Sequence, residues 1–421
     1  MNVLITPGKL SGTILIPPSK SQIHRAVIAA SLAKGKSVIS NVAYNDDVLA
    51  TIGAMEKIGV KMIRNNQQLI INGVGRVVFS DDNIIDCNES GSTLRFILPL
   101  FSLSRQKIVF VGKPGLIRRP LAIYEDMFRQ MNLSLVPNER GFIMNGALPP
   151  GVYELPGNIS SQFISGLMFA LPLLKGDSVI RLTTVLESEE YVTMTVSMLK
   201  QFGVEIAVNG NEYLIRGGQT YTPANFTVEG DFSQMTAFAA AGLMSGEVQC
   251  KNIHYDETQA DRRILDFGRR MGGVVEETDQ GYVFRKSNLI GATFDVSQCP
   301  DLTPAVALMG AVAEGITVIE NAGRLKYKES NRLLSISETL KALGADVEVG
   351  EDNLVIRGKP WLEGGPVDSF NDHRIVMMAA IASSRCQRPV LVKNVEAITK
   401  SYPDFFVDFA RIGGNFTLIE G

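Results

Sequence analysis

Six short polar motifs, spread along the chain, carry side chains suited to holding anions and to acid/base chemistry. The first, PPSKSQIHR, contains Lys20, and its Ser21 and Arg25 are four residues apart and so share one helix face. The other motifs supply Gly91, Ser92 and Arg95, then Ser160, Ser161 and Gln162, then Ser233, then Asp301, and last Asp372, His373 and Arg374. Because each motif precedes an apolar segment, we expect it to open a helix, where unpaired N–H groups and the helix dipole attract anions.

Each of these residues also has a purely structural interpretation. Ser161, Ser233 and Asp301 could simply cap helices, and Arg95 could be a solvated surface residue. His24 and His254 are more typical of packing or surface histidines than of catalysts. His373 differs, because Asp372 and Arg374 flank it at a helix start, where an imidazole can be held and its pKa tuned.

The motifs recur about every 70 residues, which predicts an internal repeat. A second helix in each repeat is expected to end at a residue that tolerates the left-handed conformation. The motif centres are Ser21, Ser92, Ser161, Ser233, Thr303 and His373, and the helix ends are Gly59, Asn132, Gly203, Gly272, Gly344 and Gly413. If the repeats stack by pseudosymmetry, their equivalent loops point to one place, and the scattered polar groups converge.

Alternating runs such as GTILIP, KSVISNV, QQLIING, DSVIRLT, YLIRGG and NLVIRG predict the strands that position these helices. Within a repeat we expect the order strand, helix, strand, helix, strand. Six repeats are too many for one sheet, so the sequence predicts an α/β protein with three repeats in each of two domains. We expect a discontinuous domain, 1–17 and 228–421, and a continuous one, 18–227. Two crossovers between them would form a hinge, and we expect a cleft that is open in the free protein and closes on binding.

The composition limits the kinds of function. A net charge of -3 and a pI near 5.8 argue against wholesale nucleic-acid binding, so an anion must be held by a local cluster of Lys and Arg. The four cysteines are far apart and lack metal-ligand spacing, so we expect reduced thiols and no metal site. With no signal-peptide pattern and no apolar run of roughly 18 residues, we expect a soluble, cytoplasmic chain that does not enter a membrane.

Nine motifs, in order along the whole chain, resemble those of the 5-enolpyruvylshikimate-3-phosphate synthase family. They are PSKSQIHR at 18–25, SGSTLR at 90–95, RRP at 118–120, SSQF at 160–163, SEEY at 188–191, PDLTP at 300–304, YKESNRL at 327–333, NDHR at 371–374 and KSYPDFF at 400–406. The resemblance implies two domains of three βαβαββ repeats each. It also implies transfer of the enolpyruvyl group of phosphoenolpyruvate to the 5-hydroxyl of shikimate 3-phosphate, releasing phosphate without metal or organic cofactor. The resemblance also implies a role in the shikimate pathway and inhibition by the herbicide glyphosate. From the same family we expect a monomer.

The resemblance assigns site residues by position in the motifs. For phosphoenolpyruvate it implies Lys20, Gly91, Arg119, Gln162, Arg332, Arg374 and Lys400. Shikimate 3-phosphate would contact Lys20, Ser21, Arg25, Ser160, Ser161, Gln162, Ser188 and Tyr191, with Asp301 and Lys328 at its ring hydroxyls. Planar guanidinium groups suit the carboxylate and phosphate of the first substrate. Asp301 and Glu329 are implied as acid/base groups, with Lys20 and His373 stabilising charge around a tetrahedral intermediate.

The chain departs from the family pattern at two positions. Glu89 stands where the family usually has Asn, which puts a negative charge near the expected phosphoenolpyruvate site unless it is paired or turned away. Asn331 replaces a usual Asp, so a charge beside Glu329 is missing.

Two other functions are compatible with a repeat architecture of this kind. A sister enolpyruvyl transferase acts on UDP-N-acetylglucosamine but usually has a reactive Cys near the Arg119 region, where this chain reads GKPGLIRRP without a thiol. A non-catalytic anion-binding module would be expected to lose Lys20, Asp301, Glu329 or His373, and all four are present.

Overall fold

The computed structural model describes residues 1–79, 83–255 and 258–419, and the chain divides into two compact units. Unit 1 comprises Met1–Pro17 and Glu229–Gly421, and unit 2 comprises Pro18–Val228. Within the described residues each unit has three four-stranded sheets. In every one of these sheets a parallel pair of strands is joined to an antiparallel pair, so the last strand of the expected repeat is replaced by two antiparallel strands. In five sheets these two strands form a hairpin, and in the sixth they are Asn2–Thr6 and Asn415–Ile419, which come from opposite ends of the chain.

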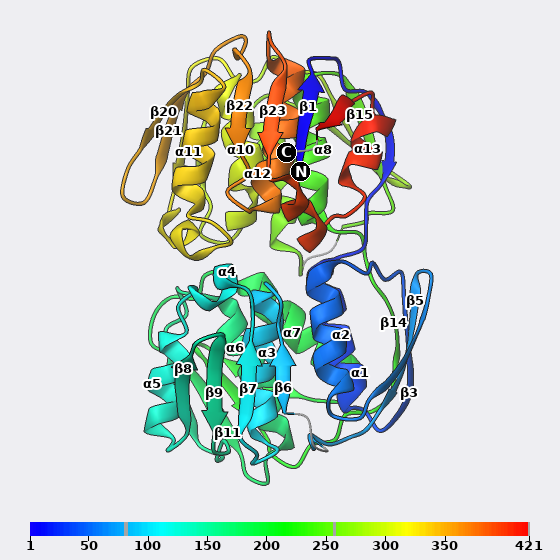
Figure 1. The fold of residues 1–421 in the computed structure, drawn as a ribbon, viewed down its shortest axis with the longest axis vertical. Coiled ribbons are helices and arrows are strands. Elements are labelled where there is room, and N and C mark those ends of the chain that lie inside the picture. Colours follow the sequence, from blue (N-terminus) through cyan, green and yellow to red (C-terminus); the bar gives the residue numbers. More distant parts are fainter. Residues whose placement is uncertain (80–82, 256–257, 420–421) are drawn as a thin grey trace. The chain divides into compact units, whose positions relative to one another are not determined.

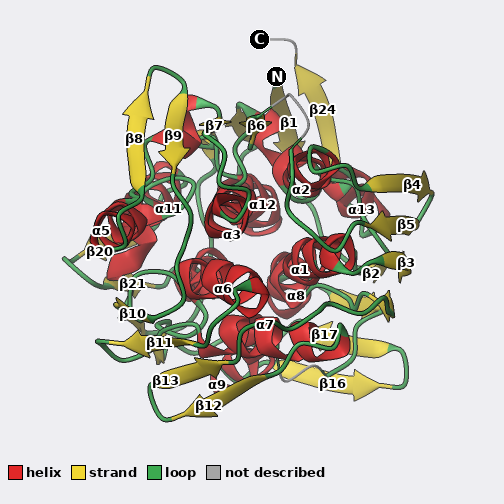
Figure 2. Ribbon diagram, turned by 90° about the horizontal axis from the view of Figure 1, so that it is seen from below, coloured by secondary structure: helices red, strands yellow, loops and turns green. Residues whose placement is uncertain are grey.

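The elements of unit 2 follow one plan. Its sheets are β14 (Asn225–Thr227), β3 (Gly35–Ser40), β5 (Gln68–Gly73) and β4 (Lys61–Asn65); β6 (Ile84–Asp86), β7 (Ile108–Val111), β9 (Gly141–Asn145) and β8 (Ser134–Asn138); and β10 (Val152–Leu155), β11 (Ser178–Leu182), β13 (Glu212–Ile215) and β12 (Ile206–Asn209). Its helices are α1 (Lys20–Leu32), α2 (Asp46–Glu56), α3 (Gly91–Ser102), α4 (Pro114–Ile117), α5 (Ala122–Gln130), α6 (Ser161–Ala170) and α7 (Glu189–Gln201). Figure 2 shows α1, α3 and α6 end-on, with strands of this unit around them.

Unit 1 repeats that plan. Its sheets are β16 (Val274–Thr278), β17 (Gly281–Arg285), β15 (Glu247–Lys251) and β2 (Gly12–Leu15); β18 (Thr293–Asp295), β19 (Ile316–Glu320), β21 (Leu354–Arg357) and β20 (Asp346–Val349); and β22 (Gly365–Asp368), β23 (Val390–Lys393), β1 (Asn2–Thr6) and β24 (Asn415–Ile419). Its helices are α8 (Phe232–Met244), α9 (Ile264–Arg270), α10 (Thr303–Ala311), α11 (Arg332–Ala342), α12 (His373–Ala382) and α13 (Phe405–Arg411). Figure 1 labels most of these elements.

One helix in each repeat is buried in the middle of its unit. Every residue of α8, α10 and α12 is buried, and nearly every residue of α1, α3 and α6 is too. A helix that is apolar and small-sided all round can only be stable inside a core. Because the six core helices are packed into the cores of their units, the positions of the polar residues in their first turns are fixed.

The expected repeat markers are confirmed. The six motif centres all lie in the first turn of a core helix, or at its first residue. All six expected helix-ending residues have positive φ, from 60° at Asn132 to 92° at Gly344. The strands at the ends of the units also pair as repeats require. At the end of unit 2, β14 lies parallel to β3, and in unit 1 the N-terminal strand β1 lies between β23 and β24. Closure of a hinged cleft stays a prediction.

Candidate active site

A polar residue one or two positions before each core helix follows the repeat, and its type differs between the two units. The six positions, about 70 residues apart, are Ser19, Ser90, Ser160, Asp231, Asp301 and Asp372. In unit 2 the three serine side chains accept a hydrogen bond from a first-turn N–H. In unit 1 two of the three aspartates do the same, and Asp301 lies instead in a 3₁₀ turn, Pro300–Leu302, that leads into α10. The core helices thus have neutral caps in unit 2, whereas α8 and α12 of unit 1 have acidic caps.

Arg25 is anchored between two helices of unit 2. Its Nη1 donates to the carbonyl of Ser21, 2.8 Å away, its Nη2 to the carbonyl of Tyr191 at 2.9 Å, and its Nε to Oγ1 of Thr195 at 2.8 Å. Burial lowers the pKa of the Arg25 guanidinium to about 10, so it keeps its charge at neutral pH. Ser188, with φ 56°, stands directly before the helix that carries Tyr191. The expected cluster of Ser21, Arg25, Ser188 and Tyr191 is therefore brought together.

Lys20 begins α1 and pairs with a residue that the motifs did not indicate. Its Nζ lies 2.7 Å from Oδ2 of Asp47, and the two side chains are 18% and 12% exposed. Asp47 lies in the first turn of α2. A partly exposed ion pair of this kind can open when an anion competes for the ammonium group.

A hydrogen-bonded chain joins the starts of α3 and α6. Nη1 of Arg95 donates to Oε1 of Gln162 at 2.7 Å, and Nε2 of Gln162 donates to Oγ of Ser92 at 2.9 Å. The Arg95 guanidinium also lies over the ring of Phe163, 5.0 Å from its centre. Arg95 is 7% exposed, so it is not a solvated surface residue. Its role is to orient Gln162, which the sequence indicated as a substrate contact.

Gly91, the first residue of α3, lies against Arg119. A Cβ atom added to Gly91 would stand 2.7 Å from Nη1 of Arg119 and 3.5 Å from Nη1 of Arg95. The glycine leaves the space that this guanidinium group occupies. Its φ is not positive, so its significance is the close approach of the arginine and not an unusual backbone.

His24 packs within unit 2, and His254 is exposed. Nδ1 of His24 hydrogen-bonds Oγ1 of Thr51 at 2.7 Å, and the ring meets Phe96 edge to face. Burial, with Lys20 and Arg25 adding to it, lowers the pKa of His24 well below its usual value. A neutral imidazole in the core fits the packing interpretation.

Arg332 is the centre of a buried charge cluster in unit 1. Its Nε and Nη2 form a fork on Asp372, at 2.8 and 3.2 Å, while Nη2 also donates to Oε2 of Glu329 at 2.5 Å and Nη1 to Oδ1 of Asp301 at 2.6 Å. The Arg332 side chain is 1% exposed and Asp372 is fully buried, whereas Asp301 and Glu329 are 20% and 19% exposed. Arg332, anchored on the buried Asp372, therefore orients the partly exposed carboxylates of Asp301 and Glu329.

The charges of this cluster hold Asp301 and Asp372 ionised. Burial opposes ionisation of Asp301, but Arg374, Lys328 and Arg332 outweigh it and hold the pKa well below the usual value. Burial also opposes ionisation of Asp372, but Arg332 outweighs it, so the pKa of Asp372 is lowered as well. Burial lowers the pKa of Lys328, although Asp301, 3.3 Å from its Nζ, acts against this shift. Asp301 is therefore ionised and suits a role as a hydrogen-bond acceptor.

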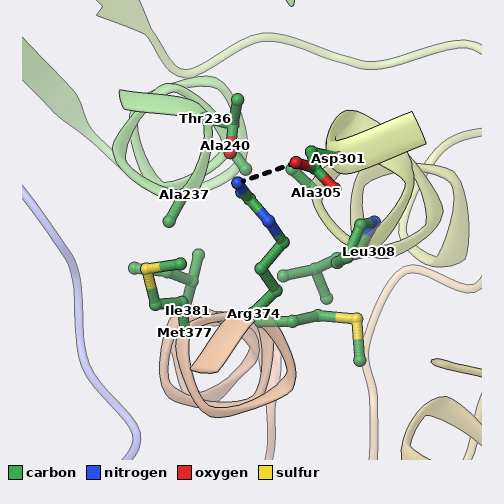
Figure 3. Close-up of a pocket in the computed structure, with 11 residues that line it drawn as sticks. Thr236, Ala237, Ala240, Asp301, Ala305, Leu308, Arg374, Met377 and Ile381 are labelled. Atoms are coloured by element: carbon green, nitrogen blue, oxygen red, sulfur yellow. Dashed lines mark hydrogen bonds and ion pairs between the residues drawn. The ribbon is translucent and has the colours of Figure 1, made fainter. Parts of the chain in front are cut away.

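Arg374 extends from α12 to the starts of two other core helices, and Figure 3 shows its ion pair with Asp301. Nη2 lies 3.3 Å from Oδ2 of Asp301, and Nη1 donates to the carbonyl of Ser233 at 3.2 Å. A cavity of about 10 Å³, room for roughly one water molecule, lies beside this side chain between α8, α10 and α12. Most of the side chains that line this cavity with Arg374 are apolar, among them Ala237, Leu308 and Met377.

His373 and Lys400 lie next to this cluster. Nδ1 of His373 is 3.9 Å from Oδ1 of Asp372, too far for a hydrogen bond, and the ring is 3% exposed. Nζ of Lys400 donates to the carbonyl of Asn371 at 2.7 Å. The side chain of Asn331 caps α11 by accepting from the N–H of Leu334, a role that the usual Asp could also fill.

The site residues expected from the sequence fall into two groups, one in each unit. Unit 2 holds Lys20, Ser21, Arg25, Gly91, Arg119, Ser160, Ser161, Gln162, Ser188 and Tyr191, and unit 1 holds Asp301, Lys328, Glu329, Arg332, His373, Arg374 and Lys400. Sequence reasoning did not identify Asp47 as the partner of Lys20, nor Asp372 as the main partner of Arg332. The repeat register before each core helix could have indicated Asp372, whereas Asp47 gives no such signal.

Within 1–79, 83–255 and 258–419, no group of three or more His, Cys, Asp or Glu side chains is placed to hold a metal ion. The four cysteines are buried and unpaired with one another. Among the helices that the structure describes, none has the length and apolar character needed to cross a bilayer.

Comparison with known proteins identifies the family. Residues 4–409 match the family model of EPSP synthase (3-phosphoshikimate 1-carboxyvinyltransferase). The chain is 42% identical over 416 residues to a 3-phosphoshikimate 1-carboxyvinyltransferase of Clostridium perfringens, with 98% of each chain covered. It is 43% identical over 420 residues to one of Clostridium acetobutylicum, covering 98% of this chain and 97% of the relative.

A solved structure of EPSP synthase from Acinetobacter baumannii resembles this fold with a TM-score of 0.82 at 25% identity, covering 99% of this chain and 100% of the other. The repeated two-unit α/β fold agrees with these matches, which extend over nearly the full length of the chain. The chain belongs to the EPSP synthase family, the 3-phosphoshikimate 1-carboxyvinyltransferases.

Proposed function

We propose that this chain carries out its family's reaction through the polar residues at the starts of its core helices. That reaction transfers the enolpyruvyl group of phosphoenolpyruvate to the 5-hydroxyl of shikimate 3-phosphate and releases phosphate, a step of aromatic amino acid biosynthesis. The observation that carries the assignment of residues is the Arg332 cluster, in which one buried guanidinium orients Asp301 and Glu329. Two carboxylates of limited exposure, surrounded by cations, suit proton transfer on an anionic substrate.

Phosphoenolpyruvate would be held by cations from several helix starts. The proposed groups are Lys20, Arg119, Arg332, Arg374 and Lys400, with Gly91 and Gln162 beside them. Guanidinium groups bind carboxylate and phosphate oxygens in pairs, and helix N-termini add favourable dipoles. The proximity of Gly91 to Arg119 supports placing both near one ligand.

Shikimate 3-phosphate would be held mainly by unit 2. The proposed groups are Lys20, Ser21, Arg25, Ser160, Ser161, Gln162, Ser188 and Tyr191, with Asp301 and Lys328 from unit 1 at the ring hydroxyls. Serine hydroxyls and N–H groups at the start of α6 suit phosphate oxygens. Since Arg25 already donates to two carbonyls and a hydroxyl, we infer that it mainly fixes the positions of Ser21 and Tyr191.

The proposed chemistry is addition followed by elimination. Asp301 takes the proton of the 5-hydroxyl while that oxygen attacks the central enol carbon, and Glu329 gives a proton to the methylene, which becomes a methyl group. Loss of a methyl proton and of phosphate then restores the double bond. Lys20 and His373 would stabilise the charge that develops on the intermediate.

The Arg332 contacts suggest how Glu329 becomes available. Arg332 makes four hydrogen bonds to three carboxylates, so a substrate carboxylate can join it most easily by replacing one of them. Asp372 is fully buried and held by a two-bond fork, whereas Glu329 is partly exposed and held by one bond. We infer that phosphoenolpyruvate displaces Glu329 from Arg332 and places that carboxyl beside its own methylene group.

The function is tested by mixing the chain with phosphoenolpyruvate and each of two acceptors. Phosphate release with shikimate 3-phosphate, and none with UDP-N-acetylglucosamine, is expected. Release with the nucleotide sugar alone would identify the sister activity, and release with neither would favour a binding module. Glyphosate is expected to compete with phosphoenolpyruvate, while its potency depends on how the buried Glu89 is oriented.

Arg119→Ala is expected to raise the KM for phosphoenolpyruvate by about 10–100-fold, the effect of losing a hydrogen bond to a charged group. The KM for shikimate 3-phosphate should change much less. Steady-state phosphate release, varying one substrate at a time, measures both constants. Arg118→Ala is the control, because that neighbouring side chain is exposed. An equal rise in both constants would show that Arg119 is wrongly assigned.

Gly91→Ala is expected to weaken phosphoenolpyruvate binding by displacing the Arg119 guanidinium, whose Nη1 is 2.7 Å from the position of the new methyl group. Shikimate 3-phosphate binding should be nearly unchanged. Gly53→Ala is a matched control, since it also places a methyl on a unit 2 helix but meets nothing within 4 Å. An unaltered KM for phosphoenolpyruvate in Gly91→Ala would contradict the proposed role of this contact.

We further expect the chain to act in the cytoplasm as a monomer, without nucleic-acid partners. Sedimentation of the purified protein with and without both substrates tests the monomer. A stable dimer under either condition would contradict it.

A further inference from the structure

The start of α8 is held by a turn that contributes no group to the proposed chemistry. Just before the 3₁₀ turn Ala260–Arg263, Gln259 donates through Nε2 to the carbonyl of Gly230 at 2.8 Å and accepts through Oε1 from the N–H of Phe232 at 3.0 Å. From the turn itself, Asp261 accepts a hydrogen bond from Oγ of Ser233. Two side chains, two residues apart in the sequence, therefore hold Gly230, Phe232 and Ser233 at this helix start.

Ser233 joins this turn to the cation cluster. Its hydroxyl donates to Asp261, and its carbonyl accepts from Nη1 of Arg374 at 3.2 Å. The other terminal nitrogen of Arg374 pairs with Asp301 at 3.3 Å, as Figure 3 shows. The guanidinium of Arg374 is therefore held between the backbone of Ser233 and the carboxylate of Asp301, and a shift of the α8 start would move one of its two supports.

The burial of Asp261 lowers the stability of the folded protein. Asp261 is 1% exposed, and Ser233 and Arg374 are 8% and 6% exposed. Burial and the nearby Asp301 raise the pKa of Asp261 to about 6, against the opposing effects of Arg374 and Ser233, and Asp231 also raises it. A buried carboxyl costs stability unless its hydrogen bonds are satisfied. An apolar side chain could fill the same space. The presence of Asp261 beside Ser233 therefore indicates a specific hydrogen-bonding role.

We propose that Asp261 is a positioning residue for the reaction: through Ser233 it fixes the start of α8, and thereby aims the guanidinium of Arg374 at phosphoenolpyruvate. The inference rests on the proposed role of Arg374 in binding that substrate. It predicts a larger effect on phosphoenolpyruvate than on shikimate 3-phosphate, because Asp261 reaches the substrates through Arg374.

The test measures the two KM values separately by phosphate release. Asp261→Ala should raise the KM for phosphoenolpyruvate about tenfold, the equivalent of one lost buried hydrogen bond, with less than about a twofold change for shikimate 3-phosphate. Asp261→Asn keeps an acceptor for Ser233 and should return the constant to within about threefold of the parent value. Ser233→Ala should reproduce the rise, and it serves as the second variant if Asp261→Ala folds poorly. Asp266→Asn, exposed on α9, is the matched control.

A double-mutant cycle separates positioning from general destabilisation. With Arg374 already replaced by Ala, Asp261→Ala should cause no further rise, because both changes remove the same interaction. Additive effects, or equal rises in both KM values, would overturn the proposal.

A readout without turnover keeps this inference separate from the proposed function. The side-chain N–H signal of Arg374 in a nitrogen–proton correlation spectrum, assigned by its absence in Arg374→Ala, should shift in Asp261→Ala and Ser233→Ala but not in Asp266→Asn. An unchanged signal would overturn the positioning role even in an active enzyme. A shifted signal in a protein that releases no phosphate would support the positioning of Arg374 while contradicting the proposed function.

Discussion

Glu329→Gln is expected to slow turnover by about 10²–10⁴-fold, the usual loss when a general acid or base is removed. Addition makes the methylene a methyl group and elimination takes a proton back, so a reversing intermediate exchanges these hydrogens with solvent. In deuterated water with shikimate 3-phosphate present, phosphoenolpyruvate recovered from the parent should carry deuterium at its methylene. The substitution should slow exchange and turnover together.

The matched control is Glu338→Gln. Glu338 is exposed on α11, the helix that follows Glu329, and its substitution should leave the rates of exchange and turnover unchanged. Near-normal exchange in Glu329→Gln, with exchange abolished by substitution of Lys20 or His373, would move the proton transfer to one of those residues. The 2.5 Å contact between Glu329 and Arg332 would then have only an orienting role.

Arg332→Ala is expected to destabilise unit 1 by about 3–5 kcal/mol, because it leaves the fully buried Asp372 without its main partner. Denaturant unfolding of the two proteins measures the difference. Arg357→Ala is the control: its side chain is 44% exposed and pairs with exposed carboxylates, so removal should cost at most about 1 kcal/mol. A loss as small as that of the control would contradict the proposed dependence of Asp372 on Arg332.

The stability difference should also depend on pH. The pKa values of Asp301 and Asp372 are lowered in the folded parent, so their contribution is present above the unfolded pKa of about 4 and is lost as the pH falls through the folded values. In Arg332→Ala this contribution is reduced. The gap between parent and variant should therefore be widest near neutral pH and narrow below about pH 4. A constant gap would mean that the charges of these carboxylates are not responsible.

The repeat could be predicted because its markers are local. A left-handed helix end needs Gly or Asn, and a buried helix needs small and apolar residues on all sides, so Gly59 and its five equivalents could be recognised without knowing what surrounds them. The strand β14 could not be predicted, because it has only three residues. Its pairing with β3 also joins residues that are 187 positions apart in the sequence, such as Asn225 and Val38. Partners that distant leave no periodic pattern.

The site was predictable in its members but not in its contacts. Glu329 and Arg332 are three residues apart on one motif, so their pairing follows from the sequence, whereas Asp372 meets Arg332 only because α11 and α12 fold beside one another. Asn331 was interpreted as a missing charge, and its observed role is to cap a helix. Ser233 was recognised only as a motif centre, because its link to Asp261 depends on a loop packing against α8.

The pairing of β1 between β23 and β24 has a consequence for synthesis on the ribosome. Unit 2 has all its strands once β14 has been made, so it can fold while the rest of the chain is still being translated. The first strand of the protein must instead wait for β24, which at usual elongation rates follows β14 by about 10–40 s. For most of that interval β1 is an unpaired strand tethered to a folded neighbour, whereas the partner of β2, β15, is made soon after β14. Nascent-chain protease protection should therefore reach 18–228 well before it reaches Asn2–Thr6.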